Sequence, residues 1–399
     1  MTLLGCKPRH TSGKVKLTYN TFWTGRDAHG TVMDWMYAEF RKRHPEIDFE
    51  VTQVAGGAQD NGQKQMAELA AGGGPDILHD SGYDQVVSGY CLDLTDHISP
   101  WKDRFYPEAL ANCTWDGRVY NFPTEYSFAP CIWNLAVLEK VGKKVPSTFD
   151  EYMDVGDALK KKGIPLTSIS VFGAFPFAAV LCGFPEVAKL IRNQEWESEP
   201  FQEAMKVCKQ IIKAGFVPTN DMELQFPNAI TLFQNDQFGH YANGAWTLIN
   251  EITAEGVDPT LRDRVAFAPF PSYNGVRPLQ AWVATKTALN QRLRHNKAKL
   301  EAAIAFMELF TSKESAERFV SMAHSPEGVK VDITEEMAGP LLYKHIRSQD
   351  EATFVFVLPN SPPNFEMNGG VAIGNAFAAM LEGASAEKAV KIYAENMRL

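Results

Sequence analysis

The pattern of apolar and polar positions near the N-terminus predicts a strand followed by a helix. Residues 15–19 alternate apolar and polar side chains, which is the period of a strand with one buried face, and the alternation ends at Thr24. Met33, Tyr37 and Phe40 then fall on one face of a predicted helix. Basic residues collect at the end of that helix, before a proline that stops it.

The next segments repeat this order. "IDFEV" alternates as a second strand, "GQKQMAELAAGGG" is typical of a helix ended by glycines, and "PDILHD" is a short third strand. Strand, helix, strand, helix, strand in this order predicts an α/β fold with a doubly wound sheet. Ligands of such sheets bind beyond the carboxyl ends of the strands, which here are residues 23–27, 53–59 and 80–84.

Three extended, proline-bearing stretches interrupt the rest of the chain. They are "GRVYNFPTEYSFAPCIWN", "FAPFPSY" and "AHSPEGV". With 399 residues the chain exceeds the roughly 250 to 300 residues at which a single core stops growing, so two lobes are expected. We therefore interpret the three stretches as crossovers, the segments in which the chain passes from one lobe to the other.

Helices are predicted between and after these stretches. Thr148 and Glu151 have the spacing of a capping box, in which each side chain satisfies a backbone N–H of the first helical turn. Ser198 is expected to cap another helix, which Gly215 ends. After "AHSPEGV" the pattern predicts a mostly helical segment to the end of the chain.

The segment "GHYANGAWTLIN" places a large aromatic residue directly after a turn. Residues 238–242 are interpreted as a strand and Trp246 as the start of a helix. Asn243 and Gly244 between them favour turns and tolerate a positive φ. The ring of Trp246 is therefore expected at the lip of a turn, where a ligand could reach it.

Composition and charge exclude some classes of partner. Hydrophobic residues make up 45% of the chain, which is enough for real cores, and the net charge is −9. Nucleic acids and anionic membrane surfaces require clustered Lys and Arg, and the chain has no long basic run. No stretch reaches the roughly 18 uninterrupted apolar residues that a membrane-spanning helix requires.

The N-terminus carries a possible processing signal. Leu3, Leu4 and Gly5 precede Cys6, and this is similar to a bacterial lipobox followed by a polar tether. We expect a lipidated Cys6 in a natural protein with a preceding signal segment, and a chance match is the alternative. A doubly acylated cysteine suffices for stable anchoring.

The other five cysteines form no CxxC pair. Buried free thiols are the favoured interpretation, and one disulfide among Cys91, Cys113 and Cys131 is the alternative if the protein is exported.

In its order of motifs the chain resembles the extracytoplasmic sugar-binding proteins of ABC importers, such as maltose-binding protein. The resemblance rests on Trp-Thr-Gly after the first strand, "RKRHPEIDFEV", "AELAAGGGPDIL", "LDLTDHI", "WDGRVYNFPTEYSFAPCIWN", "LEKVGKKVPSTFDEYMDVGDALKKKG", Gly-Ala-Trp and "AFAPFP". No piece is specific alone, but together they span more than 300 residues in the family's order. Trp133 stands where the family more often has Tyr, and Ala245 where Ser or Thr is common.

This resemblance implies a two-lobed periplasmic-binding-protein-like fold of type II, which closes on its ligand like a hinge. Residues 1–13 would be a lipobox remnant and tether, 14–124 plus 270–325 lobe one, and 125–269 plus 326–399 lobe two. The implied role is to carry a sugar or short oligosaccharide to a membrane permease outside the cytoplasm. The protein would be a monomer without cofactor or metal, held to the membrane only by its lipid anchor.

A sugar site needs aromatic rings against the C–H faces of a pyranose and polar side chains around its hydroxyls. Structural alternatives stay open: Trp23 and Trp282 could be core residues, Glu125 could bind only backbone amides, and charged loop residues are usually just solvated. Trp35, Trp101, Trp115, Trp133 and Trp196 are assigned to packing. The expected ligand contacts are Trp23, Arg26, Asp27, Asp80, Tyr83, Glu125, Tyr126, Asn243, Gly244, Trp246 and Trp282.

Two other classes of function are weighed against sugar binding. A glycosidase needs two carboxylates at a defined separation, and with 48 acidic residues a pair in the sequence means nothing by itself. The chain has no GxSxG, P-loop, GxGxxG or HExxH motif. The same fold could also bind a polyamine, a metal ion or a glycerol phosphodiester, but the mixture of Trp, Tyr, Asp, Glu and Asn favours a neutral sugar.

Overall fold

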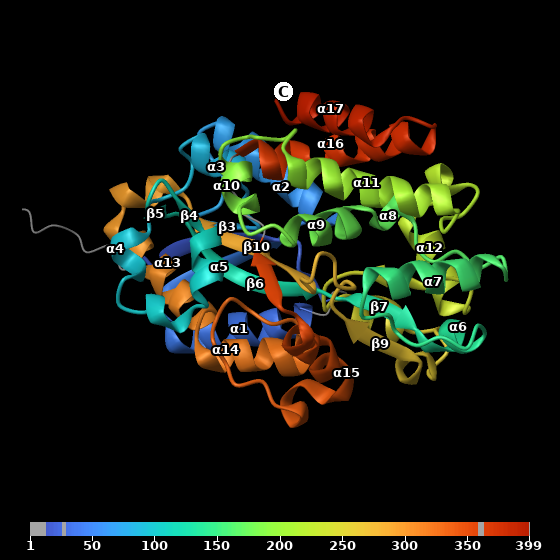
Figure 1. The fold of residues 1–399 in the computed structure, drawn as a ribbon. Helices are drawn as coiled ribbons and strands as arrows, with labels where there is room; N and C mark the ends of the chain where they lie inside the picture. The colour runs from blue at the N-terminus through green and yellow to red at the C-terminus, as the bar shows by residue number, and fades with distance from the viewer. Residues whose placement is uncertain (1–12, 26–28, 358–362, 399) are drawn as a thin grey trace, which may run out of the picture.

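The two larger β-sheets of the described residues lie one in each lobe (Figure 1). The computed structural model describes residues 13–25, 29–357 and 363–398. The sheet of lobe one has the order β11-β10-β3-β1-β2, with β6 paired to β10. Its strands are β1 (Val15–Thr21), β2 (Ile47–Gln53), β3 (Ile77–His79), β6 (Asn121–Ala129), β10 (Pro278–Leu289) and β11 (Phe354–Val357). The sheet of lobe two is β8 (His240–Ala242), β7 (Cys131–Asn134) and β9 (Val265–Ala268).

The first five elements of lobe one confirm the predicted alternation. Strands β1, β2 and β3 are parallel, and Tyr19 of β1 pairs with Val51 on one side and Ile77 on the other. Met33, Tyr37 and Phe40 are buried on α1, as their spacing predicts. The helices here are α1 (Gly30–Arg43), α2 (Gly57–Ala70), α3 (Tyr83–Val87), α4 (Thr95–Ile98), α5 (Pro107–Asn112), α13 (Lys297–Phe310) and α14 (Lys313–Arg318), with the short ribbon β4 (Thr114–Trp115) and β5 (Arg118–Val119).

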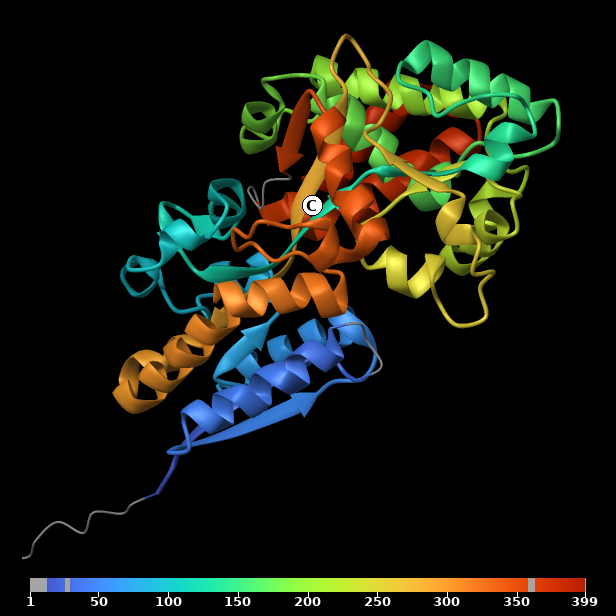
Figure 2. The same cartoon turned by 90° about the horizontal axis from the view of Figure 1, so that it is seen from below.

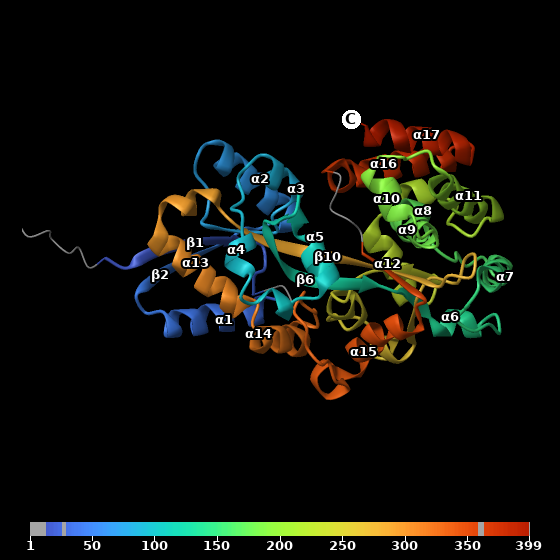
Figure 3. The same ribbon diagram turned by 60° about the vertical axis from the view of Figure 1, so that its left-hand side comes forward.

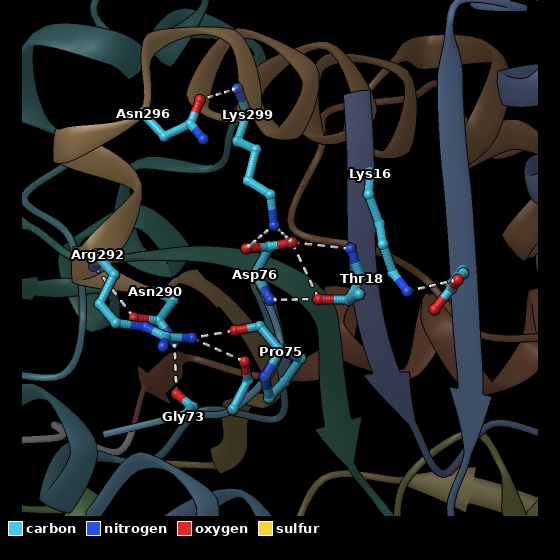
Figure 4. A network of polar contacts seen from close by, with 11 residues as sticks. Lys16, Thr18, Gly73, Pro75, Asp76, Asn290, Arg292, Asn296 and Lys299 are labelled. Carbon is cyan, nitrogen blue, oxygen red and sulfur yellow. Dashed lines mark hydrogen bonds and ion pairs between the residues drawn. The ribbon is translucent and has the colours of Figure 1, made fainter. Parts of the chain in front are cut away.

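A buried carboxylate fixes the start of β3 (Figure 4). Oδ2 of Asp76 accepts hydrogen bonds from the backbone N–H and the hydroxyl of Thr18 on β1, both at 3.0 Å. Lys299 of α13 donates to the same carboxylate at 2.9 Å, and Asn290 Nδ2 donates to the carbonyl of Pro75 at 3.0 Å. These contacts hold helix α13 and strand β1 against the start of β3.

Lobe two packs its helices around a large aromatic core. Trp133, Tyr152, Trp196, Phe201 and Tyr393 are almost fully buried in it, so the packing roles predicted for the two tryptophans are confirmed. Its helices are α6 (Leu135–Glu139), α7 (Phe149–Lys160), α8 (Ile169–Phe172), α9 (Ala174–Cys182), α10 (Val187–Arg192), α11 (Glu199–Ala214), α12 (Phe226–Gln234), α16 (Pro363–Leu381) and α17 (Ala386–Met397). Helix α15 (Glu335–Arg347) packs beside β9.

The predicted helix caps are confirmed at two of three positions. Thr148 Oγ1 accepts from the Glu151 N–H at 3.2 Å, and the Glu151 carboxylate accepts from the Thr148 N–H at 3.3 Å. Gly215 ends α11 with a φ of 72°. Ser198 occupies the N-cap position of α11, but its hydroxyl donates to the Glu195 carbonyl at 2.7 Å, so the expected cap hydrogen bond is wrong.

Long strands carry the chain between the lobes. Figure 3 shows β6 and β10 running side by side from one lobe into the other, and in Figure 2 the blue and orange segments group apart from the green ones. After residue 329 the chain is mostly helical, as predicted, but β11 was not expected there. Its four residues "FVFV" are too short a run to separate a strand from a buried helix by period.

None of the helices in the described ranges combines the length and the apolar character needed to cross a bilayer. Five cysteines are buried and form no disulfide within the described part of the chain, which confirms the thiol interpretation; they are Cys91, Cys113, Cys131, Cys182 and Cys208. Cys6 lies outside the described residues.

Candidate functional site

Strands β6 and β10 and the third proline-bearing stretch lie side by side between the lobes, and we call these three segments the crossovers. The predicted second crossover, 267–273, is wrong, because Phe270 and Tyr273 pack in the core of lobe two and β10 takes its place. Strand β6 pairs with β10 along one edge, and Trp282 of β10 lies opposite Ser127 of β6. Along the other edge of β6, the Tyr126 N–H donates to the Pro326 carbonyl at 2.9 Å, and the Gly328 N–H donates to the Pro123 carbonyl at 3.3 Å. The three segments therefore form one ribbon whose side chains alternate between two faces.

Three aromatic rings gather over one face of this ribbon. The rings of Trp246 and Trp282 meet edge to face, with centroids 5.6 Å apart at 80°. Phe175 of α9 lies 6.5 Å from Trp282. All three side chains are partly exposed, unlike the core tryptophans of lobe two. We call Phe175, Trp246 and Trp282 the aromatic group; it offers apolar ring surface to a ligand next to the crossovers.

Gly244 allows Trp246 to take this position. A Cβ added to Gly244 would lie 2.2 Å from a ring carbon of Trp246, so the indole folds back over a residue that has no side chain. Asn243 Oδ1 accepts from the Gly244 N–H at 3.0 Å, and the Ala245 N–H donates to Ser127 Oγ at 3.4 Å. The turn is thus tied both to itself and to the crossover strand β6.

The structure corrects one detail of this stretch. Strand β8 covers residues 240–242, and the helical turn η3 (Leu248–Ile252) begins after Trp246. Trp246 therefore lies in the turn itself rather than at the start of a helix.

Three buried polar side chains lie behind the turn. The hydroxyl of Tyr241 is 2.9 Å from Thr247 Oγ1 and donates to Glu251 of η3 at 3.4 Å. Burial raises the pKa of Glu251 to about 7. The support of the Trp246 turn therefore contains a carboxyl group that titrates near neutral pH.

Glu125 and Tyr126 point to opposite faces of β6, because neighbouring residues of a strand alternate. Glu125 is 4% exposed; Ser325 donates to its carboxylate at 2.6 Å, and Nε2 of His29 lies 3.5 Å away. Tyr126 instead packs against Tyr106 and lines a cavity of about 400 Å³ behind the ribbon. By alternation Glu125 and Ser127 share one face, so of the two predicted contacts only Glu125 lies on the face of Trp282.

Trp23 lies after β1 as predicted, but it is only 2% exposed. Its ring stacks on His29 at 4.2 Å and meets His79 edge to face at 4.3 Å, within the core of lobe one. In this conformation Trp23 supports His29, which in turn reaches Glu125. A direct contact of Trp23 with ligand stays a prediction.

Asp80 and Tyr83 follow β3. Asp80 is partly exposed and has a φ of 56°, a left-handed conformation that is uncommon outside glycine. Tyr83 is 5% exposed and meets Trp115 edge to face at 4.6 Å, and burial raises the pKa of its hydroxyl to about 12. The ring contact also fits the packing role predicted for Trp115. Both candidates lie on lobe one, on the side where α3 packs against α16 of lobe two.

Arg26 and Asp27 lie outside the described residues, so their predicted roles stay predictions. Sequence reasoning missed Ser127 and Phe175. Ser127 could have been found from the alternation with Glu125, whereas Phe175 lies in the run "FGAFPFAAV", which has no signal beyond that of a core helix. Among the described residues, no three His, Cys, Asp or Glu side chains are placed to hold a metal ion.

Comparison with known proteins identifies the family. The sequence profile of the bacterial extracellular solute-binding proteins matches residues 35–326. The chain belongs to this family.

Individual relatives are distant. An arabinooligosaccharide-binding protein of Bacillus subtilis is 24% identical over 218 residues, which cover 51% of this chain and 50% of that protein. A multiple sugar-binding protein of Streptococcus mutans is 21% identical over 83% of this chain and 79% of its own length. A chitin oligosaccharide binding protein of known structure, 20% identical, covers 96% of this chain and 98% of its own with a TM-score of 0.79. This likeness confirms the predicted type II fold.

Proposed function

We propose that this solute-binding protein captures an oligosaccharide between its lobes and delivers it to the membrane permease of an ABC importer. The observation that carries the proposal is the aromatic group beside the crossovers. Partly exposed rings from α9, the Gly-Ala-Trp turn and β10 offer faces on which pyranose C–H groups can stack.

Polar groups near these rings suit sugar hydroxyls. Ser127 lies opposite Trp282, Asn243 belongs to the same turn as Trp246, and Glu125 lies two residues before Ser127 on the same face. A hydroxyl both donates and accepts, so carboxylate, amide and hydroxyl groups together can satisfy it. Each neutral hydrogen bond contributes only about 0.5 to 1.5 kcal/mol, so several must combine with stacking to reach micromolar affinity.

The names of the relatives support an oligosaccharide as the ligand class. They bind arabino-oligosaccharides, chitin oligosaccharides or several sugars, so they favour no single sugar. The chain spans only about half the length of the arabinooligosaccharide-binding protein. That the present chain binds the same class of ligand is therefore our proposal.

We further propose that the protein works as a monomer on the outer side of the cell membrane. Lipidation of Cys6 would anchor it there, since two acyl chains give stable membrane attachment. A Cys6→Ala variant expressed behind a lipoprotein signal peptide should then move from the membrane fraction, where the wild type is expected, to the soluble extracytoplasmic fraction.

A thermal-shift screen tests the ligand class. The panel contains arabino-, chito- and malto-oligosaccharides with their monosaccharides, and spermidine represents the polyamine alternative. A ligand that binds only the folded protein stabilises it by about 2.7 kcal/mol at a hundredfold excess over Kd. We expect at least one oligosaccharide to raise Tm and spermidine to leave it unchanged.

Two outcomes would contradict the proposal. If spermidine alone raised Tm, the cargo would belong to another class of solute. If no sugar in the panel raised Tm, the aromatic group would have no support as a carbohydrate platform. Chromatography of the sugars after incubation separates binding from catalysis, since a binding protein returns its ligand intact.

A further inference from the structure

Glu327, in the third crossover, is a buried carboxyl group without a compensating contact. It is 2% exposed, and within the described part of the chain neither of its side-chain oxygens has a hydrogen-bond partner. An ionised carboxylate in such a place costs several kcal/mol unless it is paired. In this arrangement of the lobes Glu327 is therefore protonated.

A second glutamate lies beside it on β6. The backbone hydrogen bonds from Tyr126 to Pro326 and from Gly328 to Pro123 bracket Glu327 and place it opposite Thr124 and Glu125. Burial, and then the charge of Glu125, hold the pKa of Glu327 well above its ordinary value of 4.5. Two buried carboxyl groups from two different crossovers thus lie near enough for the charge of one to act on the other.

The other titratable groups around the pair do not neutralise Glu327. His29, ahead of α1, and Ser325 both contact Oε1 of Glu125. His324 precedes on the same crossover, and burial lowers its pKa, which favours its neutral form. Lys286 of β10 lies opposite Pro123 in the strand register, but it lines the small cavity beside Tyr83.

Both glutamates lie where the chain passes between lobes that are in contact. Helix α16 of lobe two packs against α3 of lobe one, so the structure has the lobes together. Hinge motions are absorbed by a few residues of such connecting segments. Separation of the lobes would let water reach the ribbon, and a hydrated carboxyl group loses its proton near its ordinary pKa.

We propose that Glu125 and Glu327 form a carboxyl pair that holds a proton while the lobes are together and releases it when they separate. Lobe separation is then favoured as pH rises. For one linked proton, the ratio of separated to apposed lobes increases by up to about tenfold per pH unit. The proposal rests on the crossovers and not on the identity of the ligand.

Small-angle X-ray scattering of the full chain without sugar, between about pH 5 and pH 9, tests this. The wild-type radius of gyration should rise with pH as the lobes separate. Glu327→Gln keeps the shape of the side chain without its charge, and its radius should stay at the low-pH value. Glu251→Gln is the matched control, because it removes another buried carboxyl group of raised pKa that lies within lobe two.

The proposal is overturned if the wild-type radius does not change with pH, or if Glu327→Gln shows the same rise as the wild type. Loss of the rise in Glu251→Gln would also overturn it, since the effect would not be specific to the crossovers. Should Glu327→Gln fail to fold by circular dichroism, Glu125→Gln replaces it. Because the charge of Glu125 helps to hold the proton on Glu327, its removal should lower the pKa of Glu327 and shift the transition to lower pH. An unshifted midpoint, or a shift to higher pH, would contradict the pair.

Because this experiment contains no sugar, it can fail while the proposed function stands. Equally, a sugar screen without any positive result leaves the scattering prediction intact.

Discussion

At the scale of single residues, Trp246 depends on Gly244 for its position. Because a Cβ on Gly244 would lie 2.2 Å from the indole, Gly244→Ala must displace the ring. We expect this substitution to weaken sugar binding at least about tenfold, or 1.4 kcal/mol, as measured by calorimetric titration. Gly62→Ala in α2 is the control, since nothing lies within 4 Å of its added Cβ and it should leave affinity unchanged.

Removal of the indole itself gives a second prediction. Trp246→Ala should weaken binding at least about tenfold while circular dichroism and Tm show an intact fold, because the ring is partly exposed and outside the main cores. Trp35→Ala is matched to it: Trp35 is also partly exposed but packs under Arg318, 4.1 Å away, on lobe one. Equal loss of affinity in both variants would remove the special role of Trp246.

Local chemistry made the position of Trp246 at a turn predictable from the sequence, while its contact with ligand stays a prediction. Asn243 and Gly244 favour a turn, and Trp246 follows two residues after Gly244. Phe175 and Glu327 were not predictable, because their neighbours come from distant segments and their own surroundings in sequence look like core or loop. Burial of Trp23 could not be foreseen either, since it depends on stacking with His29 and contact with Phe319.

At the scale of secondary-structure elements, the N-cap residues Thr148 of α7 and Ser198 of α11 look alike in the sequence but make different hydrogen bonds in the structure. Thr148 accepts from the Glu151 N–H, whereas Ser198 donates to the Glu195 carbonyl. Thr148→Ala should therefore lower the free energy of unfolding by about 1 kcal/mol in urea denaturation. Ser198→Ala should cost clearly less, and an equal cost would show that the cap hydrogen bond is not the cause.

The turn that carries Trp246 should be sensitive to pH through Glu251. Burial raises the pKa of Glu251 from 4.5 to about 7, so the folded protein holds a proton that the unfolded chain releases between these values. The free energy of unfolding should therefore fall as pH rises through this window, by at most about 3 kcal/mol. In urea titrations at about pH 5 and pH 8, Glu251→Gln should show a smaller fall than the wild type. Glu301→Gln, at an exposed position of α13, should behave like the wild type.

Elements with a long periodic pattern were predictable, and those without one were not. The helices with caps and the alternating strands of lobe one lie where the pattern places them, because each contains its own signal. Strand β11 escaped prediction, since its four residues gain their strand conformation only by pairing with β10. The mixed topology also follows from β10, which pairs antiparallel with β3 and β6 but parallel with β11.

At the scale of the whole molecule, the first and third proline-bearing stretches were enough to predict where the chain passes between two lobes, whereas the second lies in lobe two and β10 takes its place. Chain length required a second core, and the aromatic cores around the two sheets supply it. The residue boundaries of the lobes stay a prediction. The ribbon formed by the three crossovers is what the sequence could not reveal, because it depends on backbone hydrogen bonds between residues about 200 positions apart, such as Tyr126 and Pro326.

The central claim is that the protein captures an oligosaccharide without altering it. The most direct test is isothermal titration calorimetry of the wild-type protein with each oligosaccharide of the panel. The sugar is then recovered from the calorimeter cell and analysed by chromatography. We predict saturable binding to one site for at least one oligosaccharide and complete recovery of the intact sugar. Absence of binding across the panel, or cleavage that increases with the amount of protein, would contradict the account.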